Sequence, residues 1–373
     1  MNETPIIEEY EDIVGIATRK GNPFRGVYIP PTPADIIEPA LRRAKSISPE
    51  LKGTRDPILR KKRIVIARLR VFSEELSNRL LKIVKQCPST EKMNPFYLAA
   101  MEIWLSKDDY KVALAKIHGA SKVIRRIARD YVLRIRTLRK DELTPTKEIL
   151  DKIDKLRREA YGRLISVVKS LKKELSILAE TVKKMKRLPD YDPTLPTVVV
   201  TGPPNSGKSS FVKAVSNANV EIAPYPFTTK NITFGHIEYR FNGVVIRRIQ
   251  IVDTPGLFDR PIEERKEPEL LALNAIKHLA DVILFLFDGS YEAATSVEEQ
   301  TRIYQTVRKF FPEGKPFITA INKIDIIDEE TVKEIISFLR NIDQKDPILI
   351  SVKEKKNIDK VLSEIFKELD PSS

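Results

Sequence analysis

Residues 197–210 read Thr-Val-Val-Val-Thr-Gly-Pro-Pro-Asn-Ser-Gly-Lys-Ser-Ser. The β-branched run at the start predicts a buried strand, and the residues after the lysine predict a helix. Between them lies the pattern G-x-x-x-x-G-K-[ST], which forms a phosphate-binding loop where it joins a strand to a helix. Its glycines let the backbone N–H groups face phosphate, and the helix N-terminus adds a favourable dipole. The stretch therefore predicts an α/β domain that binds a nucleotide.

Within this loop, we expect Lys208 to reach the β- and γ-phosphates and the Ser209 hydroxyl to bind Mg²⁺. The strand–loop–helix context argues against the alternative of a plain glycine turn with a surface lysine. The other loop residues expected to contact the nucleotide are Gly202, Asn205, Ser206, Gly207 and Ser210.

Two further motifs complete the predicted phosphate and metal site. Asp253-Thr-Pro-Gly256 ends a predicted strand 45 residues after Lys208. An acidic residue there can hold Mg²⁺ through water, and the Gly256 N–H can sense the γ-phosphate. Between these motifs, the run Tyr-Pro-Phe-Thr-Thr-Lys ends at Lys230. We expect the hydroxyl of Thr229 to reach Mg²⁺, and Thr228 is the second candidate. The alternative is that the threonine only marks the start of the next strand and has no metal-binding role.

The next motif predicts which base is bound. Asn322-Lys-Ile-Asp325 follows an apolar predicted strand. The Asp325 carboxylate can accept two hydrogen bonds from the guanine N1–H and amine, whereas adenine lacks that donor pair and would leave the carboxylate unpaired. We expect Asn322 to brace the loop and the stem of Lys323 to cover the base. A backbone N–H in Ser351-Val352-Lys353, after the last predicted strand, would read guanine O6. The predicted ligands are GTP or GDP with Mg²⁺.

Outside these motifs, the chain divides at a proline-rich stretch near residue 190, with one predicted domain at 1–190 and a second at 191–373. The second alternates strands and helices, which predicts a mostly parallel sheet with helices on both faces. Its predicted strands are Thr197–Thr201, Ile232–Phe241, Val244–Val252, Val282–Phe287, Phe317–Ile321 and Ile348–Ser351. Its predicted helices lie near Ser209–Ser216, Glu269–Leu279, Val297–Phe310, Glu330–Arg340 and Ile358–Leu369.

Residues 1–190 predict an extended lead and then a helical bundle with short connections. The predicted helices run from Pro33 to Ser46, from Pro57 to near Pro88, from Pro95 through Trp104, from Asp109 to Lys140, and from Thr144-Pro145 to Arg187 with or without a break. The predicted fold class is therefore α plus α/β, a helical bundle followed by a P-loop GTPase domain.

The net charge of +13 is unevenly distributed. Residues 1–190 carry 42 Lys and Arg against 25 Asp and Glu, a net charge of +17, whereas the remaining residues carry 23 against 27, a net charge of −4. A basic half points to a polyanionic partner.

One cysteine excludes an internal disulfide. The sequence shows neither a signal peptide nor an apolar run of membrane-spanning length, so we expect a cytoplasmic chain. We expect a monomer, because no heptad seam is evident.

Two clusters carry much of the positive charge. The first, at the start of the second predicted helix, is Arg60, Lys61, Lys62 and Arg63, together with Lys52, Arg55, Arg68 and Arg70. The second is a predicted helical stripe of Lys122, Arg126, Arg129, Arg136 and Lys140. Like charges at such spacing repel, and phosphate contacts would relieve the repulsion. Because no RNA-binding motif with stacking aromatics is present, we expect recognition of folded RNA through its shape and backbone. The alternative is a solvated, salt-bridged helical face.

The motifs resemble the translation-factor class of P-loop GTPases near the Obg and Era groups. The run from Gly202 through Pro224-Tyr-Pro-Phe-Thr-Thr-Lys230 and Asp253-Thr-Pro-Gly-Leu257 is similar to the nucleolar GTP-binding protein 1 family. Asn94-Pro-Phe-Tyr97 and Leu188-Pro-Asp-Tyr-Asp192 resemble its helical domain. This resemblance implies a role in assembling the large ribosomal subunit, bound to ribosomal RNA. Eukaryotic members continue far beyond this domain, so the functions of that tail are not expected here, and the short form is typical of archaea.

Leu257 stands where Ras-like enzymes carry a glutamine that orients water, and leucine cannot hydrogen-bond to water. Asn205 matches the asparagine that in several relatives helps to hold K⁺, which could supply positive charge between the phosphates. A loop-bracing hydrogen bond is the equal alternative for Asn205. Arg260 and Arg265 are further candidates, as arginines that would stabilise charge on the phosphates during hydrolysis. The alternative is that both are solvated surface charges. We therefore expect slow hydrolysis that rises with K⁺ or on a ribosomal particle. Two other functions remain open: a regulatory switch that binds a protein or an anionic membrane surface through its basic helices, and a nucleotide-dependent scaffold with negligible turnover.

Overall fold

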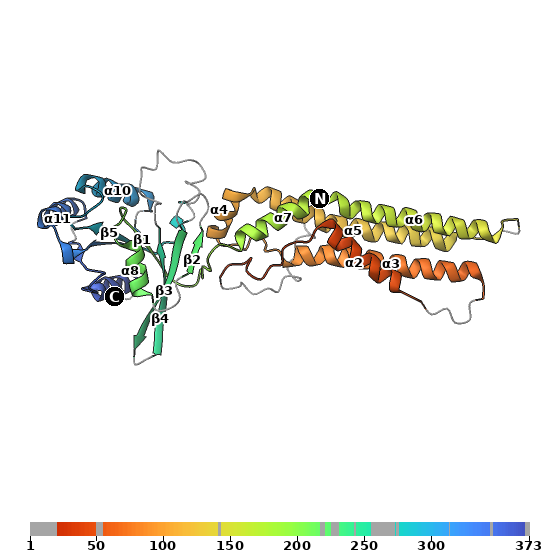
Figure 1. Ribbon diagram of the computed structural model, residues 1–373, viewed down its shortest axis with the longest axis horizontal. Coiled ribbons are helices and arrows are strands. Elements are labelled where there is room, and N and C mark those ends of the chain that lie inside the picture. Colours follow the sequence, from red (N-terminus) through yellow and green to blue (C-terminus); the bar gives the residue numbers. More distant parts are fainter. Residues whose placement is uncertain are drawn as a thin grey trace, which may run out of the picture. The chain divides into compact units, whose positions relative to one another are not determined.

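The computed structural model describes residues 21–49, 55–140, 143–216, 221–224, 231–241, 244–254, 273, 276–312, 314–343 and 346–369 (Figure 1). These residues form two compact units. The first takes in Phe24–Lys92 and Leu105–Lys184, and the second takes in the residues just before Phe24, Met93–Trp104 and the chain from Met185 onward. The predicted division near residue 190 stays a prediction.

The first unit is a bundle of long helices. Its elements are α2 (Pro33–Ser46), α3 (Pro57–Gln86), α5 (Lys107–Thr137), α6 (Thr146–Ser170) and α7 (Lys172–Met185). Helix α3 packs against α5 and α6, and α2 packs against α3, so the long helices lie side by side (Figure 1).

Local side-chain chemistry sets where these helices begin. The Thr32 hydroxyl accepts a hydrogen bond from the Asp35 N–H, and the Asp35 carboxylate accepts one from the Thr32 N–H at 3.0 Å. Asp56 caps α3 in the same way, at 2.8 Å from the Ile58 N–H. A proline follows each cap, where its missing N–H costs nothing. The predicted starts of α2 and α3 are confirmed.

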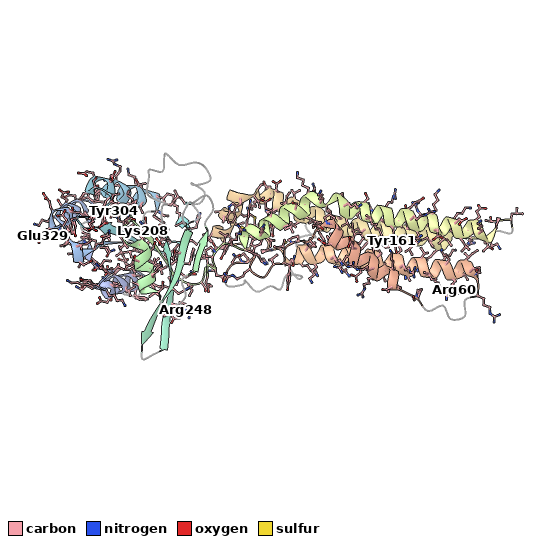
Figure 2. The ribbon with its side chains drawn as sticks, in the orientation of Figure 1. Arg60, Tyr161, Lys208, Arg248, Tyr304 and Glu329 are labelled. Atoms are coloured by element: carbon pink, nitrogen blue, oxygen red, sulfur yellow. The ribbon has the colours of Figure 1, made fainter. Side chains whose placement is uncertain are left out.

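The apolar face of α3 forms much of the bundle core. Leu69, Phe72, Leu76 and Leu80 recur at helical spacing and are fully buried. The Phe72 ring stacks on that of Tyr161 of α6, with ring centroids 4.7 Å apart. Tyr161 is labelled in Figure 2. Burying a side chain of this size stabilises the fold by roughly 1.5–3 kcal/mol.

Two helix ends in the first unit differ from the predictions or resolve them. Helix α5 ends at Thr137, so the prediction that it reaches Lys140 is wrong. The segment after Pro145 is broken into two helices, because the Leu171 N–H bonds to Val168 O as α6 ends, and α7 starts one residue later. None of the helices that the structure describes has the length and apolar character needed to cross a lipid bilayer.

The second unit contains a seven-stranded sheet within the described residues. Its strands are β1 (Thr197–Thr201), β2 (Glu221–Pro224), β3 (Asn231–Phe241), β4 (Val244–Asp253), β5 (Val282–Asp288), β6 (Phe317–Asn322) and β7 (Ile348–Leu349). The order is β2-β3-β4-β1-β5-β6-β7. Pairs β2–β3 and β3–β4 are antiparallel and the others are parallel, which confirms the mostly parallel sheet. The sequence prediction missed β2 and made β7 two residues too long.

Helices cover both faces of this sheet. They are α8 (Lys208–Val215), α10 (Val297–Phe310), α11 (Glu329–Asp343) and α12 (Ile358–Glu368). On one face α8 and α12 bury Phe211, Val212 and Ile365 against β1, β5 and β6. On the other face Tyr304 of α10 packs edge-on against Phe285 of β5, with ring centroids 5.1 Å apart. Tyr304 is labelled in Figure 2. The predicted helix over 269–279 falls mostly outside the described residues.

Helix α4 (Pro95–Trp104) also belongs to the second unit. The Tyr97 hydroxyl donates to Pro189 O and accepts from the Tyr191 N–H, both at 2.9 Å. The Phe96 ring lies 6.2 Å from that of Phe234 in β3. These contacts tie α4 to the chain segment that leads into β1.

Candidate nucleotide-binding site

The loop between β1 and α8 follows a path that only some residues can adopt. Gly202 and Gly207 have φ angles of +145° and +94°, and Asn205 has +63°. A Cβ at Gly202 would lie 2.3 Å from Leu286 O, and one at Gly207 would lie 2.2 Å from Asn322 Nδ2. Both glycines are therefore required by conformation and by space. The loop curls at the carboxyl end of β1, beside the switch in strand order where α/β sheets bind ligands.

Lys208, labelled in Figure 2, is almost completely buried. Its ammonium donates hydrogen bonds to Gly202 O at 2.9 Å and to Pro203 O at 2.6 Å. Carbonyl oxygens of the loop therefore hold the ammonium at the place where an anion would enter.

A hydroxyl and a carboxylate meet beside the loop. Ser209, in the first turn of α8, donates a hydrogen bond from Oγ to Oδ2 of Asp253, which is fully buried at the end of β4. Such oxygen ligands are those that Mg²⁺ prefers. The neighbouring Ser206 Oγ is buried and has no hydrogen-bond partner among the described residues. A phosphate oxygen would satisfy it, so the residues present fit a nucleotide with Mg²⁺.

Asn322 couples this loop to the predicted base site. Its Nδ2 donates to Ser206 O at 2.9 Å, and its Oδ1 accepts from the Val352 N–H at 3.1 Å. Asn322 is buried at the end of β6. One side chain thus fixes the phosphate loop against the loop after β7, in agreement with the predicted bracing role.

Asp325 lies beside a cavity of about 640 Å³. The Ser351 hydroxyl donates to Asp325 Oδ1 at 2.6 Å, and this hydrogen bond holds the pKa of the carboxyl below its usual value. Asp325 is therefore ionised at neutral pH and has oxygen lone pairs to offer a ligand. The residues lining the cavity are Asn205, Gly207, Ser210, Lys213, Ala214, Asn322, Lys323, Asp325, Ile326, Val352 and Lys353.

One backbone N–H among Ser351, Val352 and Lys353 was predicted to read guanine O6, and the structure distinguishes the three donors. The Ser351 N–H donates to Lys356 O at 3.2 Å, and the Val352 N–H is taken by Asn322. The Lys353 N–H makes no hydrogen bond to any described residue. Of the three, Lys353 has the backbone donor that remains available to a ligand.

The structure therefore brings most of the predicted nucleotide site together in one unit. Thr228, Thr229, Gly256, Leu257, Arg260 and Arg265 lie outside the described residues, so their roles stay predictions. The sequence analysis missed Asp288 and Gln300. Asp288 accepts a hydrogen bond from Lys323 Nζ at 2.6 Å, and Gln300 bonds the main chain of Asp288. No sequence motif marks either residue.

The first basic cluster is partly engaged inside the helical unit. Lys61 donates to Asp154 of α6 at 2.8 Å, and this hydrogen bond lowers the pKa of Asp154. Lys62 donates to Leu138 O and, at 3.3 Å, to Arg136 O, near the C-terminus of α5. A cation there complements the helix dipole. Arg60, in contrast, is exposed and projects away from α3 (Figure 2).

Members of both basic clusters line one cavity in the helical unit. It has a volume of about 520 Å³ and is lined by the cations Lys62, Arg63, Arg70 and Arg136 and by the residues Pro49, Leu59, Ile66 and Ala67. Lys122, Arg126 and Arg129 are exposed along α5. Lys140 lies three residues beyond the end of α5, so the predicted single helical stripe does not include it. Arg70, which the sequence places with the first cluster, lines this cavity together with Arg136.

Comparisons with known proteins cover both units. Residues 24–192 match the model described as the NOG1 N-terminal helical domain, and residues 197–323 match the model described as 50S ribosome-binding GTPase. The chain is 36% identical over 317 residues to the uncharacterized protein MJ1408 of Methanocaldococcus jannaschii, with 85% of each chain covered.

Eukaryotic relatives share the same two regions. The chain is 30% identical to the nucleolar GTP-binding protein 1 of Drosophila melanogaster over 92% of this chain and 49% of the relative. It is also 30% identical to that of Saccharomyces cerevisiae, over 86% of this chain and 46% of the relative. The chain thus spans about half the length of these eukaryotic relatives.

Proposed function

We propose that this chain, which belongs to the nucleolar GTP-binding protein 1 family, is a GTP-hydrolysing switch that acts in the assembly of the large ribosomal subunit. The observation that carries the proposal is the juxtaposition, in one unit, of the curled loop at Gly202 with the ionised carboxylate of Asp325. Asn322 hydrogen-bonds Ser206 O of the loop at 2.9 Å and the Val352 N–H at 3.1 Å. The residue before Val352, Ser351, donates its hydroxyl to the Asp325 carboxylate.

In this proposal the loop residues hold the phosphates. The Lys208 ammonium exchanges its carbonyl partners for phosphate oxygens, and Ser206 Oγ and the N–H groups at the start of α8 donate to the phosphates. Ser209 and Asp253 would hold Mg²⁺, with Thr229 as the further predicted ligand. Bound Mg²⁺ neutralises charge on the phosphate oxygens.

The base-recognition residues then select guanine. Asp325 accepts hydrogen bonds from the guanine N1–H and amine, and the Lys353 N–H donates to guanine O6. Adenine offers no donor pair to the Asp325 carboxylate and no carbonyl to this N–H, and losing such hydrogen bonds discriminates strongly between substrates. The aliphatic stem of Lys323 covers the base.

Hydrolysis cannot use a glutamine after Gly256, since residue 257 is leucine. We propose slow turnover that rises when Asn205 helps to hold K⁺ between the phosphates or when a ribosomal particle is bound. Asn205 is exposed, has a left-handed backbone conformation and lines the nucleotide cavity. Single-turnover rates of GTP hydrolysis in matched KCl and NaCl test the proposed role of K⁺. Equal rates in the two salts would exclude that role.

The helical unit supplies the proposed RNA surface. Exposed cations on α5 and the cavity near Arg136 would contact phosphates of ribosomal RNA, with release of counterions. Arg60 and Arg63 of α3 extend this surface, whereas Lys61 and Lys62 mainly hold the bundle together through their partners. We further propose that the chain acts as a monomer in the cytoplasm, which light scattering and cell fractionation would check.

Co-sedimentation with large ribosomal subunits tests the function directly. The chain is expected to pellet with the subunits, to a different extent with GDP and with a non-hydrolysable GTP analogue. Failure to pellet in either state, together with binding to anionic vesicles or to a protein, would favour a regulatory switch. Pelleting without single-turnover hydrolysis on the particle would favour a nucleotide-dependent scaffold.

A further inference from the structure

Asp288, the last residue of β5, is a fully buried carboxylate that does not line the nucleotide cavity. Its Oδ1 accepts hydrogen bonds from the Ser290 N–H at 3.1 Å and from the Ser290 hydroxyl at 2.7 Å. Its Oδ2 accepts one from Lys323 Nζ at 2.6 Å. A buried charge is stable only when it is paired and hydrogen-bonded, and these three donors provide that.

Gln300 of α10 fixes the main chain of the same residue. Its Oε1 accepts from the Asp288 N–H at 2.9 Å, and its Nε2 donates to Asp288 O at 3.0 Å. Gln300 is itself fully buried. The side chain therefore extends the hydrogen bonding of the sheet by one step and sets the position of the Asp288 carboxylate.

Lys323 is held at two points by this arrangement. Its backbone has a φ angle of +67°, a conformation that costs energy for a residue with a side chain. Its ammonium is anchored on Asp288, while Lys323 itself lines the nucleotide cavity together with Asp325. The aliphatic stem between these two points consequently has little freedom and forms part of the cavity wall.

We propose that Asp288 and Gln300 are positioning residues that hold the Lys323 stem in place for the guanine base. They set the affinity for guanine nucleotides without touching the nucleotide. The inference rests on the proposed function, because it assumes that guanine occupies the cavity beside Asp325.

The physical reason is preorganisation. A lysine side chain that is free before binding loses rotamer entropy when it packs against a base, whereas an anchored stem has already lost it. Replacing Asp288 by asparagine keeps the shape of the side chain but removes the charge that anchors the ammonium. The stem then becomes mobile, and the nucleotide is released faster.

The test is a double-mutant cycle on the affinity and dissociation rate of a fluorescent GDP analogue. D288N is expected to weaken GDP binding about tenfold, mainly through faster dissociation, and K323M is expected to weaken it similarly. In the double variant, D288N should lower GDP affinity by less than a further twofold relative to K323M alone. The reason is that the lysine ammonium, through which Asp288 acts, is already absent. The control is D281N, at the residue just before the same strand. Asp281 accepts a hydrogen bond from the Thr197 N–H at 2.9 Å, and this variant should bind GDP as the wild type does.

Additivity separates a positioning role from a merely structural one. The inference is overturned if D288N weakens GDP binding by the same factor in the wild-type and K323M backgrounds. It is also overturned if D288N leaves GDP binding unchanged. Should D288N not unfold cooperatively, S290A, which removes one donor to Asp288, is expected to weaken GDP binding about threefold, and no change there would overturn the inference as well. If the wild-type chain does not prefer GDP to ADP, the proposed function itself fails, so the two failures are distinguishable.

Discussion

Replacing Gly207 by alanine would break the coupling between the phosphate loop and the base loop. The new Cβ would lie 2.2 Å from Asn322 Nδ2, far inside van der Waals contact. Asn322 is not free to withdraw, because the same amide donates to Ser206 O and accepts from the Val352 N–H. Either the loop or the asparagine must therefore leave its position.

The loss of GDP binding free energy in G207A is the sum of two contributions. An alanine with a φ angle of +94° costs about 1–2 kcal/mol relative to glycine. The two hydrogen bonds of Asn322 contribute about 1 kcal/mol each. Because nucleotide binding requires both loops in the positions described, the total of about 3–4 kcal/mol appears in the binding free energy. This corresponds to a loss of GDP affinity on the order of 10²–10³-fold.

Titration calorimetry of GDP binding by G207A and by the wild type measures this loss. The matched control is G162A, since a Cβ at Gly162 in α6 would meet no atom within 4 Å. That variant should bind GDP normally and unfold at a higher temperature, because alanine favours a helix over glycine by about 1 kcal/mol. A G207A protein that binds GDP within threefold of the wild type would refute the reasoning.

Three further changes test other parts of the site and the bundle. K208M keeps the buried stem but removes the ammonium. GDP affinity, measured by calorimetry, should fall at least about a hundredfold, because charge-assisted hydrogen bonds to phosphate are lost. Unchanged GDP binding would exclude the loop as the binding site. Because the hydrogen bond from Lys61 lowers the pKa of Asp154 from its ordinary value of 3.8, the pair stabilises the fold above that pH. The contribution is lost as the pH falls below 3.8 and through the lowered pKa of the folded state. D154N should thus lower the unfolding free energy by about 0.5–1 kcal/mol at pH 7 and flatten its fall between about pH 5 and 3, as followed by urea titration; identical pH profiles would contradict this. R136A should reduce the slope of log affinity for ribosomal RNA against log salt by about 1 and leave GDP binding intact, and an unchanged slope would remove Arg136 from the RNA surface.

Elements whose signals are local could be predicted from the sequence. The helix starts at Thr32-Pro33 and Asp56-Pro57 depend on residues within four positions of each other in the chain. The phosphate loop was predictable for the same reason, since Gly202 and Gly207 meet geometric needs of one short turn. The order of motifs along alternating strands and helices then fixed the fold class.

Elements that depend on distant partners were missed. Strand β2 has four residues and owes its existence to antiparallel pairing with β3. The charged cluster at the start of α3 gave no sign that Lys61 would pair with Asp154, 93 residues away. Likewise, Asp288 meets Lys323 across 35 residues, and nothing adjacent to either residue marks the contact. Tertiary packing creates these interactions, so no short pattern encodes them.

The central claim, that Asp325 selects a guanine nucleotide held by the loop at Gly202, is tested most directly by exchanging the base. Xanthine carries a carbonyl where guanine has its amine, so an asparagine could accept from N1–H and donate to that carbonyl. Affinities of the wild type and D325N for GDP, ADP and xanthosine diphosphate should therefore be compared. The wild type should prefer GDP by a factor on the order of 10³, and D325N should prefer xanthosine diphosphate. Equal binding of ADP and GDP by the wild type, or an undiminished preference of D325N for GDP, would contradict the account.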